Sequence, residues 1–144
     1  MSSPLPGHTN IASLFAYGTL LPGEERWRML APFVVDEGFA DTVQGEVYDT
    51  GLGYPAARFD RAGVIHGRTF RLLASSLVDA LRVLDEVEGV VDGEYRRIVV
   101  TTTAGYQAWS YECGAIEGMR LTALANGDWV SRHRSRDHVG GERR

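Results

Sequence analysis

The spacing of hydrophobic residues along this chain changes from a period near two to a period near 3.6 in one segment only. Short runs that are continuously apolar or have a period of two predict strands, and the segment with the longer period, 76–88, predicts a helix. Strands are expected at 13–17, 33–36, 42–49, the end of 51–59, 63–72, and in a hairpin over 96–113. These elements predict an α+β domain with a curled sheet or small mixed β-barrel, one main helix (76–88) and short flanking helices, including one over 24–31.

Glycines predict where the strands bend or turn. Gly45 lies inside the stretch 42–49 and indicates a bulge or bend there. The stretch 63–72 is expected to pair back across the turn DRAG with the extended run that precedes it.

The predicted helix carries signals at both ends and one apolar face. Ser76, followed three residues later by an aspartate, has the pattern of a capping box, and Gly89 fits a C-terminal cap. At about 100° per residue, three leucines fall within about 60° of one another and form the expected core face. These are Leu77, Leu81 and Leu84.

One carboxylate lies on this apolar face. Glu88 falls about 20° from Leu77 on the helical wheel, whereas Glu86 points to the opposite side. Burial and the negative end of the helix dipole would both raise the pKa of Glu88, which is the condition of a general acid/base near neutral pH. Alternatively, Glu88 bends away to water or to Arg96 or Arg97, and the wheel does not decide between these readings.

The first predicted strand ends in the sequence YGTL at 17–20, where Gly18 interrupts the apolar run. A turn entered by a glycine with positive φ exposes consecutive amide groups that form a nest for a carboxylate or an oxyanion. An ordinary loop is the alternative. Tyr17 and Tyr95 are candidates to supply hydroxyl groups, with Tyr111 a weaker one, and each fits equally well as a core residue with its hydroxyl at the edge.

Charge and composition narrow the class of protein. The net charge of −4 divides unevenly: residues 1–130 carry ten Arg and seventeen Asp or Glu, and 131–144 carry five Arg and two acidic residues. An acidic body argues against nucleic acid as the main ligand. No apolar stretch is long enough to span a membrane, so we expect a cytoplasmic protein. We also expect the chain to divide into a loose leader (1–12), one domain (13–130) and an Arg-rich, disordered tail (131–144).

Several kinds of chemistry are disfavoured by the residues available. The chain has no lysine, which excludes a Schiff base, and its single cysteine, Cys113, lies in a mostly apolar strand without a histidine nearby in sequence. His133 and His138 lack metal-site spacing, so no metal and no cofactor is expected. A glycosidase pair of carboxylates is disfavoured because Glu86 and Glu88 point apart.

An ordered set of motifs resembles the gamma-glutamylcyclotransferase-like superfamily, and within it the gamma-glutamylamine cyclotransferase-like branch. The resemblance runs from about residue 13 to 130 and leaves out the tail. Each motif is common alone, and their order and spacing make the resemblance specific. The motifs are YGTL (17–20), GLGYPA (51–56), LDEVEG (84–89), YRR (95–97), AWSYEC (108–113) and GDW (127–129).

The resemblance implies a function and its residues. The fold would be a small mixed barrel with flanking helices, and Glu88 would be the catalytic base facing a substrate cradle of Tyr17, Gly18, Thr19 and Leu20 with Tyr95. The reaction would be that of a ring-closing acyltransferase or lyase that releases 5-oxoproline from a small-molecule γ-glutamyl compound, as in glutathione metabolism. A noncatalytic binding module for a small acidic metabolite is the alternative. The leaving amine, set by loops such as 21–30, 50–55 and 89–94, and the oligomeric state stay open.

Overall fold

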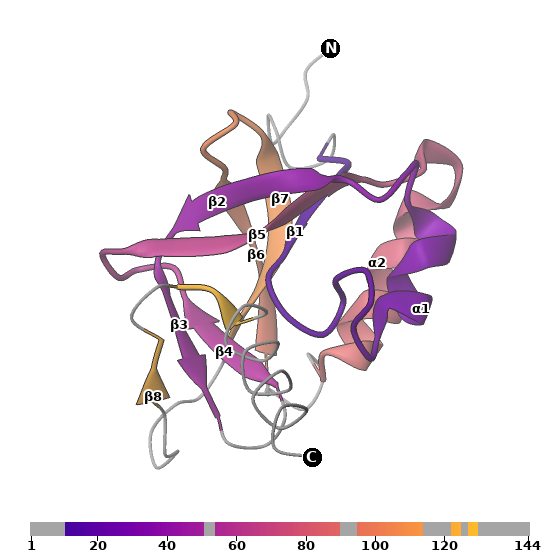
Figure 1. The fold of residues 1–144 in the computed structure, drawn as a ribbon. Coiled ribbons are helices and arrows are strands. Elements are labelled where there is room, and N and C mark those ends of the chain that lie inside the picture. The colour runs from indigo at the N-terminus through magenta and orange to yellow at the C-terminus, as the bar shows by residue number, and fades with distance from the viewer. Residues whose placement is uncertain (1–10, 51–53, 90–94, 114–121, 125–126, 130–144) are drawn as a thin grey trace, which may run out of the picture.

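The structure, a computed structural model, describes residues 11–50, 54–89, 95–113, 122–124 and 127–129. This part of the chain is an α+β fold with helices α1 and α2 and strands β1 to β8 (Figure 1). The helices are α1 (Trp27–Leu30) and α2 (Leu77–Val87), each flanked by a short 3-10 turn, Ala31–Phe33 and Ala74–Ser76. The strands are β1 (Ser13–Ala16), β2 (Phe39–Gln44), β3 (Glu46–Asp49), β4 (Pro55–Arg58), β5 (Val64–Arg71), β6 (Tyr95–Thr101), β7 (Gln107–Cys113) and β8 (Thr122–Ala123).

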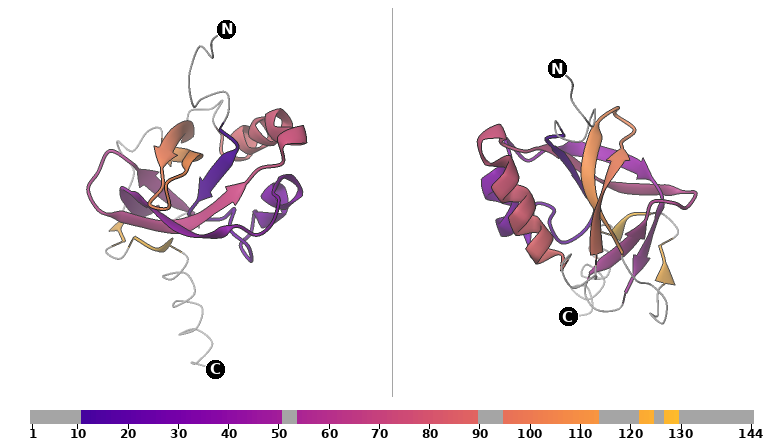
Figure 2. Two further views of the ribbon diagram at one scale, coloured as in Figure 1. Left: turned by 90° about the horizontal axis from the view of Figure 1, so that it is seen from above. Right: turned by 180° about the vertical axis from the view of Figure 1, so that it is seen from behind.

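The strands form two sheets rather than a closed barrel among the residues described. The larger sheet has the order β2-β5-β1-β7-β6, and the smaller has the order β4-β3-β8. The larger sheet curls, with α1 and α2 together on one side and the smaller sheet below it (Figures 1 and 2). The α+β class with a curled sheet and one main helix is therefore confirmed.

The central strand β1 is buried along its whole length because it separates two apolar cores. Its residues alternate between them, as the period of a strand requires. Leu14 packs in the core under the helices, with Phe70 and Leu84, and Phe15 packs in the core toward the smaller sheet, with Val47. The apolar run at 13–17, which has no polar alternation, is explained by this burial on both faces.

The main helix was predicted correctly, except for its N-terminal cap. Leu84 is fully buried, Leu77 and Leu81 pack against the same core, and Gly89 ends the helix with φ of 70°. The capping box at Ser76 was wrong, since that side chain makes no cap hydrogen bond. Ser76 instead ends a 3-10 turn in which its N–H donates to the carbonyl of Leu73 at 3.1 Å.

Three strand predictions need correction. The stretch 33–36 is not a strand: Pro32 favours the 3-10 turn that ends at Phe33, and Val34 makes only an isolated bridge to Leu72. The stretch 42–49 is two strands, because the chain bends at Gly45, where φ is 149°. The strand 63–72 was placed correctly as β5, but it pairs with β1 and β2, not with β4.

The predicted leader and tail fall largely outside the described residues, which begin at Ile11. Ile11 itself is buried, and the carbonyl of Ala12 accepts a hydrogen bond from the N–H of Leu72 at 2.7 Å. In the described ranges, no helix has the length and apolar character needed to cross a membrane.

Candidate active site

Strand topology brings the predicted site residues to one edge of the larger sheet, namely the edge at which the carboxyl ends of β1 and β7 lie. Strand β1 runs parallel to β7, so their carboxyl ends lie at the same edge, where Tyr17 follows β1 and Tyr111 lies in β7. Strand β6 runs antiparallel to β7 and pairs Tyr95 with Cys113, which brings the start of β6 to that edge as well. The three tyrosines are far apart in sequence and adjacent in the fold.

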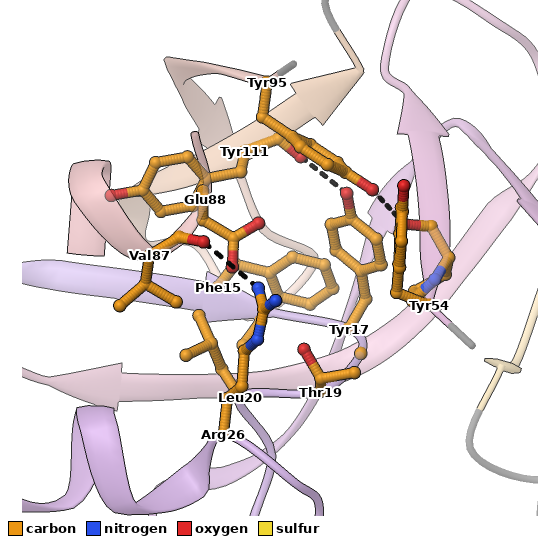
Figure 3. Close-up of a pocket in the computed structure, with 13 residues that line it drawn as sticks. Phe15, Tyr17, Thr19, Leu20, Arg26, Tyr54, Val87, Glu88, Tyr95 and Tyr111 are labelled. Carbon is orange, nitrogen blue, oxygen red and sulfur yellow. Dashed lines mark hydrogen bonds between the residues drawn. The ribbon is translucent and has the colours of Figure 1, made fainter. Parts of the chain in front are cut away.

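A pocket of about 240 Å³ opens at this edge, between the sheets and the end of α2 (Figure 3). All of the predicted site residues line it, namely Tyr17, Gly18, Thr19, Leu20, Glu88 and Tyr95, together with the weaker candidate Tyr111. Its other lining residues are Phe15, Ala16, Arg26, Tyr54, Pro55 and Val87. The structure thus brings the residues together, while their catalytic and binding roles stay predictions.

Glu88 is held at the pocket by the end of α2. It is the C-cap residue, with φ of −87° and ψ of 0°, and its N–H donates to the carbonyl of Leu84 at 2.9 Å. The side chain lies among the pocket residues in Figure 3, whereas Glu86 is exposed to solvent. The arginines considered as alternative partners for it hold other carboxylates: Arg96 pairs with Glu112, and Arg97 pairs with Asp85, each at 2.9 Å.

The turn after β1 owes its glycine to a close approach rather than to positive φ. We expected Gly18 in the left-handed region, and this was wrong, because its φ is not positive. A Cβ at position 18 would instead lie 2.6 Å from Cγ and 2.9 Å from Cδ of Pro55. Glycine is therefore required there because the ring of Pro55, at the start of β4, packs directly on the backbone.

Two amide groups of this turn have no hydrogen-bond partner among the described residues. The carbonyl of Gly18 accepts from the N–H of Leu21 at 3.1 Å, and the carbonyl of Thr19 accepts from the N–H of Arg26 at 2.7 Å. The N–H groups of Thr19 and Leu20 donate to no group within the described ranges. Thr19 and Leu20 both line the pocket, and an amide there without a protein partner is a hydrogen-bond donor for an anion.

The three tyrosine hydroxyl groups donate to the protein. Tyr17 donates to the carbonyl of Tyr111 at 2.6 Å, Tyr95 donates to the carbonyl of Pro55, and Tyr111 donates to Oδ1 of Asp85 at 2.7 Å. Burial raises the pKa of each of these tyrosines, and the negative charge of Glu88 raises it further. The hydroxyls are therefore protonated at neutral pH and leave only their oxygen lone pairs to accept hydrogen bonds from a ligand.

We expect the free energy of unfolding to fall steeply above pH 10. Tyrosine ionises near pH 10 in the unfolded chain, but the raised pKa keeps Tyr17, Tyr95 and Tyr111 neutral in the fold. Below pH 10 these tyrosines are neutral in both the folded and the unfolded protein, so they do not change the free energy of unfolding. Above pH 10, each of them lowers the free energy of unfolding by about 1.4 kcal/mol per pH unit. Urea unfolding between pH 9 and 11.5 measures this slope. Tyr95→Phe should make it shallower than Tyr106→Phe, an exposed control, and equal slopes for the two variants would contradict the assignment.

A polar network joins the helix that carries Glu88 to the larger sheet. Asp85, one turn before Glu88, accepts from Tyr111 on β7 and from Arg97 on β6, with Nε of Arg97 at 2.9 Å. The guanidinium of Arg97 also stacks on Trp109, with 4.3 Å from Cζ to the ring centroid. These contacts fix the rotation of α2, and with it the direction of the Glu88 side chain.

Sequence reasoning missed Arg26, Tyr54 and Pro55 as lining residues. It also missed Asp85, which joins α2 to Arg97 and Tyr111. Arg26 lies in the segment predicted as a short helix, where nothing in the pattern distinguishes it from an exposed arginine. Tyr54 and Pro55 belong to the motif GLGYPA, which indicated that the segment resembles the family but not where its side chains point. Asp85 stands in the motif LDEVEG, three positions before Glu88, and that helical spacing was the available signal.

Comparison with known proteins identifies the family. The family model "Gamma-glutamyl cyclotransferase, AIG2-like" matches residues 14–131. The chain belongs to this family. A relative from Halalkalibacterium halodurans, named "Putative gamma-glutamylcyclotransferase", is 30% identical over 93 residues, which cover 61% of this chain and 80% of that protein.

Solved structures of low sequence identity share the fold of this member of the AIG2-like family. An uncharacterized protein of Pyrococcus horikoshii has a TM-score of 0.67 at 19% identity, covering 88% of this chain and 97% of that chain. The allophanate hydrolase of Kluyveromyces lactis has a TM-score of 0.63 at 13% identity, covering 88% of this chain and 21% of that chain. Since one fold occurs in proteins with different names, the fold alone does not assign the chemistry of this family member.

Proposed function

We propose that this protein releases 5-oxoproline and a free amine from a γ-glutamyl amine or γ-glutamyl amino acid by intramolecular cyclotransfer. Glu88 is the general acid/base, and the turn of Tyr17, Gly18, Thr19 and Leu20 is the backbone cradle. The observation that carries the proposal is that a carboxylate and a turn with unpaired amides, from distant parts of the chain, line one pocket. Membership of the cyclotransferase family supports the reaction class.

The reaction needs no nucleophile from the protein. The α-amino nitrogen of the substrate attacks its own γ-carbonyl carbon, a five-membered lactam forms, and the bond to the leaving amine breaks. Two protons leave the attacking nitrogen, and the amine departs with both as an ammonium ion, so the protons balance without water. The work of the enzyme is to fold the substrate and to move these protons.

Glu88 performs the proton transfers. The substrate amino group arrives as an ammonium ion and must lose a proton before its lone pair attacks. A carboxylate beside it accepts that proton and then delivers it to the leaving nitrogen, which would otherwise depart as an unstable amide anion. The tyrosines do not compete for this role, because burial raises the pKa of Tyr17, Tyr95 and Tyr111 and keeps them protonated.

The amides of Thr19 and Leu20 stabilise negative charge. When the ring closes, the γ-carbonyl oxygen becomes an oxyanion, and unpaired N–H groups in a partly enclosed pocket bind it more strongly than they bind the neutral carbonyl. Donors of this kind contribute on the order of 3 kcal/mol each to lowering a barrier in other enzymes. The turn and the base therefore act on the same transition state from two elements.

The selectivity for the leaving amine is proposed to lie in the loops that border the pocket. The lining residues Tyr54 and Pro55 come from the loop 50–55. The rest of the third loop, 90–94, falls outside the described residues.

The test is release of 5-oxoproline from a panel of γ-glutamyl compounds that share the head group and differ in the leaving group. The panel contains γ-glutamyl dipeptides, glutathione, Nε-(γ-glutamyl)lysine and γ-glutamyl alkylamines. We expect stoichiometric 5-oxoproline and free amine from at least one of them. Saturable binding of these compounds with no product from any of them would contradict the enzyme and favour the noncatalytic binding module.

A further inference from the structure

Two opposite charges line the pocket. Among the described lining residues, Arg26 carries the only positive charge and Glu88 the only negative one. In Figure 3, the guanidinium of Arg26 lies within the ring of lining side chains, beneath the carboxylate of Glu88. The two do not form an ion pair within the described residues, whose ion pairs are at other positions. Opposite charges on the lining of one pocket match a ligand that carries both signs.

Arg26 is held in place from two sides. Its backbone N–H donates to the carbonyl of Thr19 at 2.7 Å, and its Nη1 donates to the carbonyl of Val87 at 3.1 Å. These bonds connect the YGTL turn to the residue before Glu88. The tether to Val87 uses one of the five donor hydrogens of a guanidinium, and no other hydrogen bond of this side chain to a described residue exists.

We propose that Arg26 binds the α-carboxylate of the γ-glutamyl head group. The head group of such a substrate is a zwitterion, and its two charges match the two sides of the pocket: the carboxylate meets Arg26, and the ammonium group meets Glu88. This inference rests on the proposed function for the identity of the substrate. It makes Arg26 a substrate-binding residue and explains how the amino group is presented to its base.

The assignment also divides the work between Arg26 and the turn. A guanidinium forms paired, charge-assisted hydrogen bonds with a carboxylate, which are stronger than bonds from neutral amides. With the α-carboxylate on Arg26, the amides of Thr19 and Leu20 remain for the γ-carbonyl oxygen. The two readings of the turn, as a carboxylate nest or as an oxyanion site, are thereby resolved in favour of the oxyanion.

A purely structural role for Arg26 accounts for less of the arrangement. If the side chain served only to cap the end of α2 at Val87, its remaining donors would face a half-enclosed pocket without a partner, which costs desolvation energy. A ligand carboxylate supplies that partner. The two roles make different predictions, because a cap affects every ligand equally and a carboxylate site affects only ligands that carry a carboxylate.

The experiment compares two ligands in two proteins. 5-Oxoproline carries the substrate's α-carboxylate on a lactam ring, and 2-pyrrolidinone is the same ring without it. NMR titration of the wild type should show 5-oxoproline binding about 10- to 100-fold more tightly than 2-pyrrolidinone. In Arg26→Gln this preference should fall to within about threefold, with the affinity for 2-pyrrolidinone nearly unchanged.

Arg28→Gln is the matched control. It removes the same charge two residues away, from an exposed position of α1 outside the pocket, and should keep the preference of the wild type. Arg26→Lys should keep part of it, since it keeps the charge without the paired donors. A wild type without a preference for 5-oxoproline, or an Arg26→Gln variant that retains the preference, overturns the assignment.

The outcome separates this inference from the proposed function. Binding of 5-oxoproline that depends on Arg26, without product from any γ-glutamyl compound, would retain the carboxylate site and reject the enzyme. Product release that persists in Arg26→Gln with an unchanged KM would retain the enzyme and reject the carboxylate site. Weaker binding of both lactams to the same extent in Arg26→Gln would reduce Arg26 to a cap on α2.

Discussion

Replacement of Glu88 by glutamine is expected to lower the kcat for 5-oxoproline release by about 10²- to 10⁴-fold, with a much smaller change in KM. The amide of glutamine has nearly the shape of the carboxylate, so it fits the same place at the end of α2 and leaves the pocket intact. It cannot accept a proton from the substrate ammonium at neutral pH, and the attacking lone pair is not released. The loss therefore falls on the chemical step rather than on binding.

Glu86→Gln is the control for this variant. It removes the same charge from the same turn of α2, but from an exposed side chain that does not line the pocket. We expect its kcat to stay within twofold of the wild type. Unfolding curves of both variants show whether either change acts through stability. A Glu88→Gln protein that is folded and still turns over at the rate of the wild type would remove Glu88 from the mechanism.

The place of Glu88 at the pocket was predictable because it depends on a local period. A helix of defined register places residues on faces, and Glu88 lies on the face of the buried Leu84 whatever the rest of the fold does. The hairpin of β6 and β7 was likewise predictable, since its two strands are adjacent in sequence and join at a glycine, Gly105, whose φ is 98°. Local signals were sufficient where local geometry decides the structure.

The pairing of β5 was not predictable in this way. Strands β3 and β4 form a hairpin that leaves the larger sheet after β2, and the chain rejoins that sheet at β5. The N–H of Gly45 donates to the carbonyl of Gly63 at 3.1 Å and joins the two ends of the segment that contains β3 and β4. A strand can pair with its neighbour in sequence or with an earlier strand, and the choice depends on the packing of both sheets rather than on either strand alone.

Two lining residues were not predicted from the sequence for the same reason. Arg26 reaches the pocket only because the turn after β1 folds back, and Pro55 does so only because β4 belongs to the smaller sheet. Neither placement has a local signature. Gly18 shows the limit most directly: glycine was expected there for its backbone conformation, and the structure requires it for a contact with a residue 37 positions later. The sequence therefore marked the position but not the physical reason for its glycine.

Replacement of Gly18 by alanine is expected to impair the cradle by steric displacement. The added Cβ would lie 2.6 Å from Cγ of Pro55, which is closer than carbon atoms approach without a shift. The proline ring is stiff, and the carbonyl of Pro55 is held by the hydroxyl of Tyr95, so the turn moves more easily than β4. Displacement of the amides of Thr19 and Leu20 from the developing oxyanion should lower kcat by about 10²- to 10³-fold. The overpacking should also cost about 1–3 kcal/mol of stability.

Two further variants show whether the loss comes from the contact itself. Gly105→Ala should destabilise the protein by about 1 kcal/mol, because φ at Gly105 is 98°, but this exposed turn has open space and lies outside the pocket, so kcat should not change. Pro55→Ala removes Cγ and Cδ, the two atoms that an alanine at position 18 would meet, and keeps the carbonyl that binds Tyr95. The double variant Gly18→Ala with Pro55→Ala should therefore recover at least tenfold of the kcat lost in Gly18→Ala. If it recovers nothing while Gly18→Ala alone is inactive, the close approach of Pro55 is not the reason that position 18 is glycine.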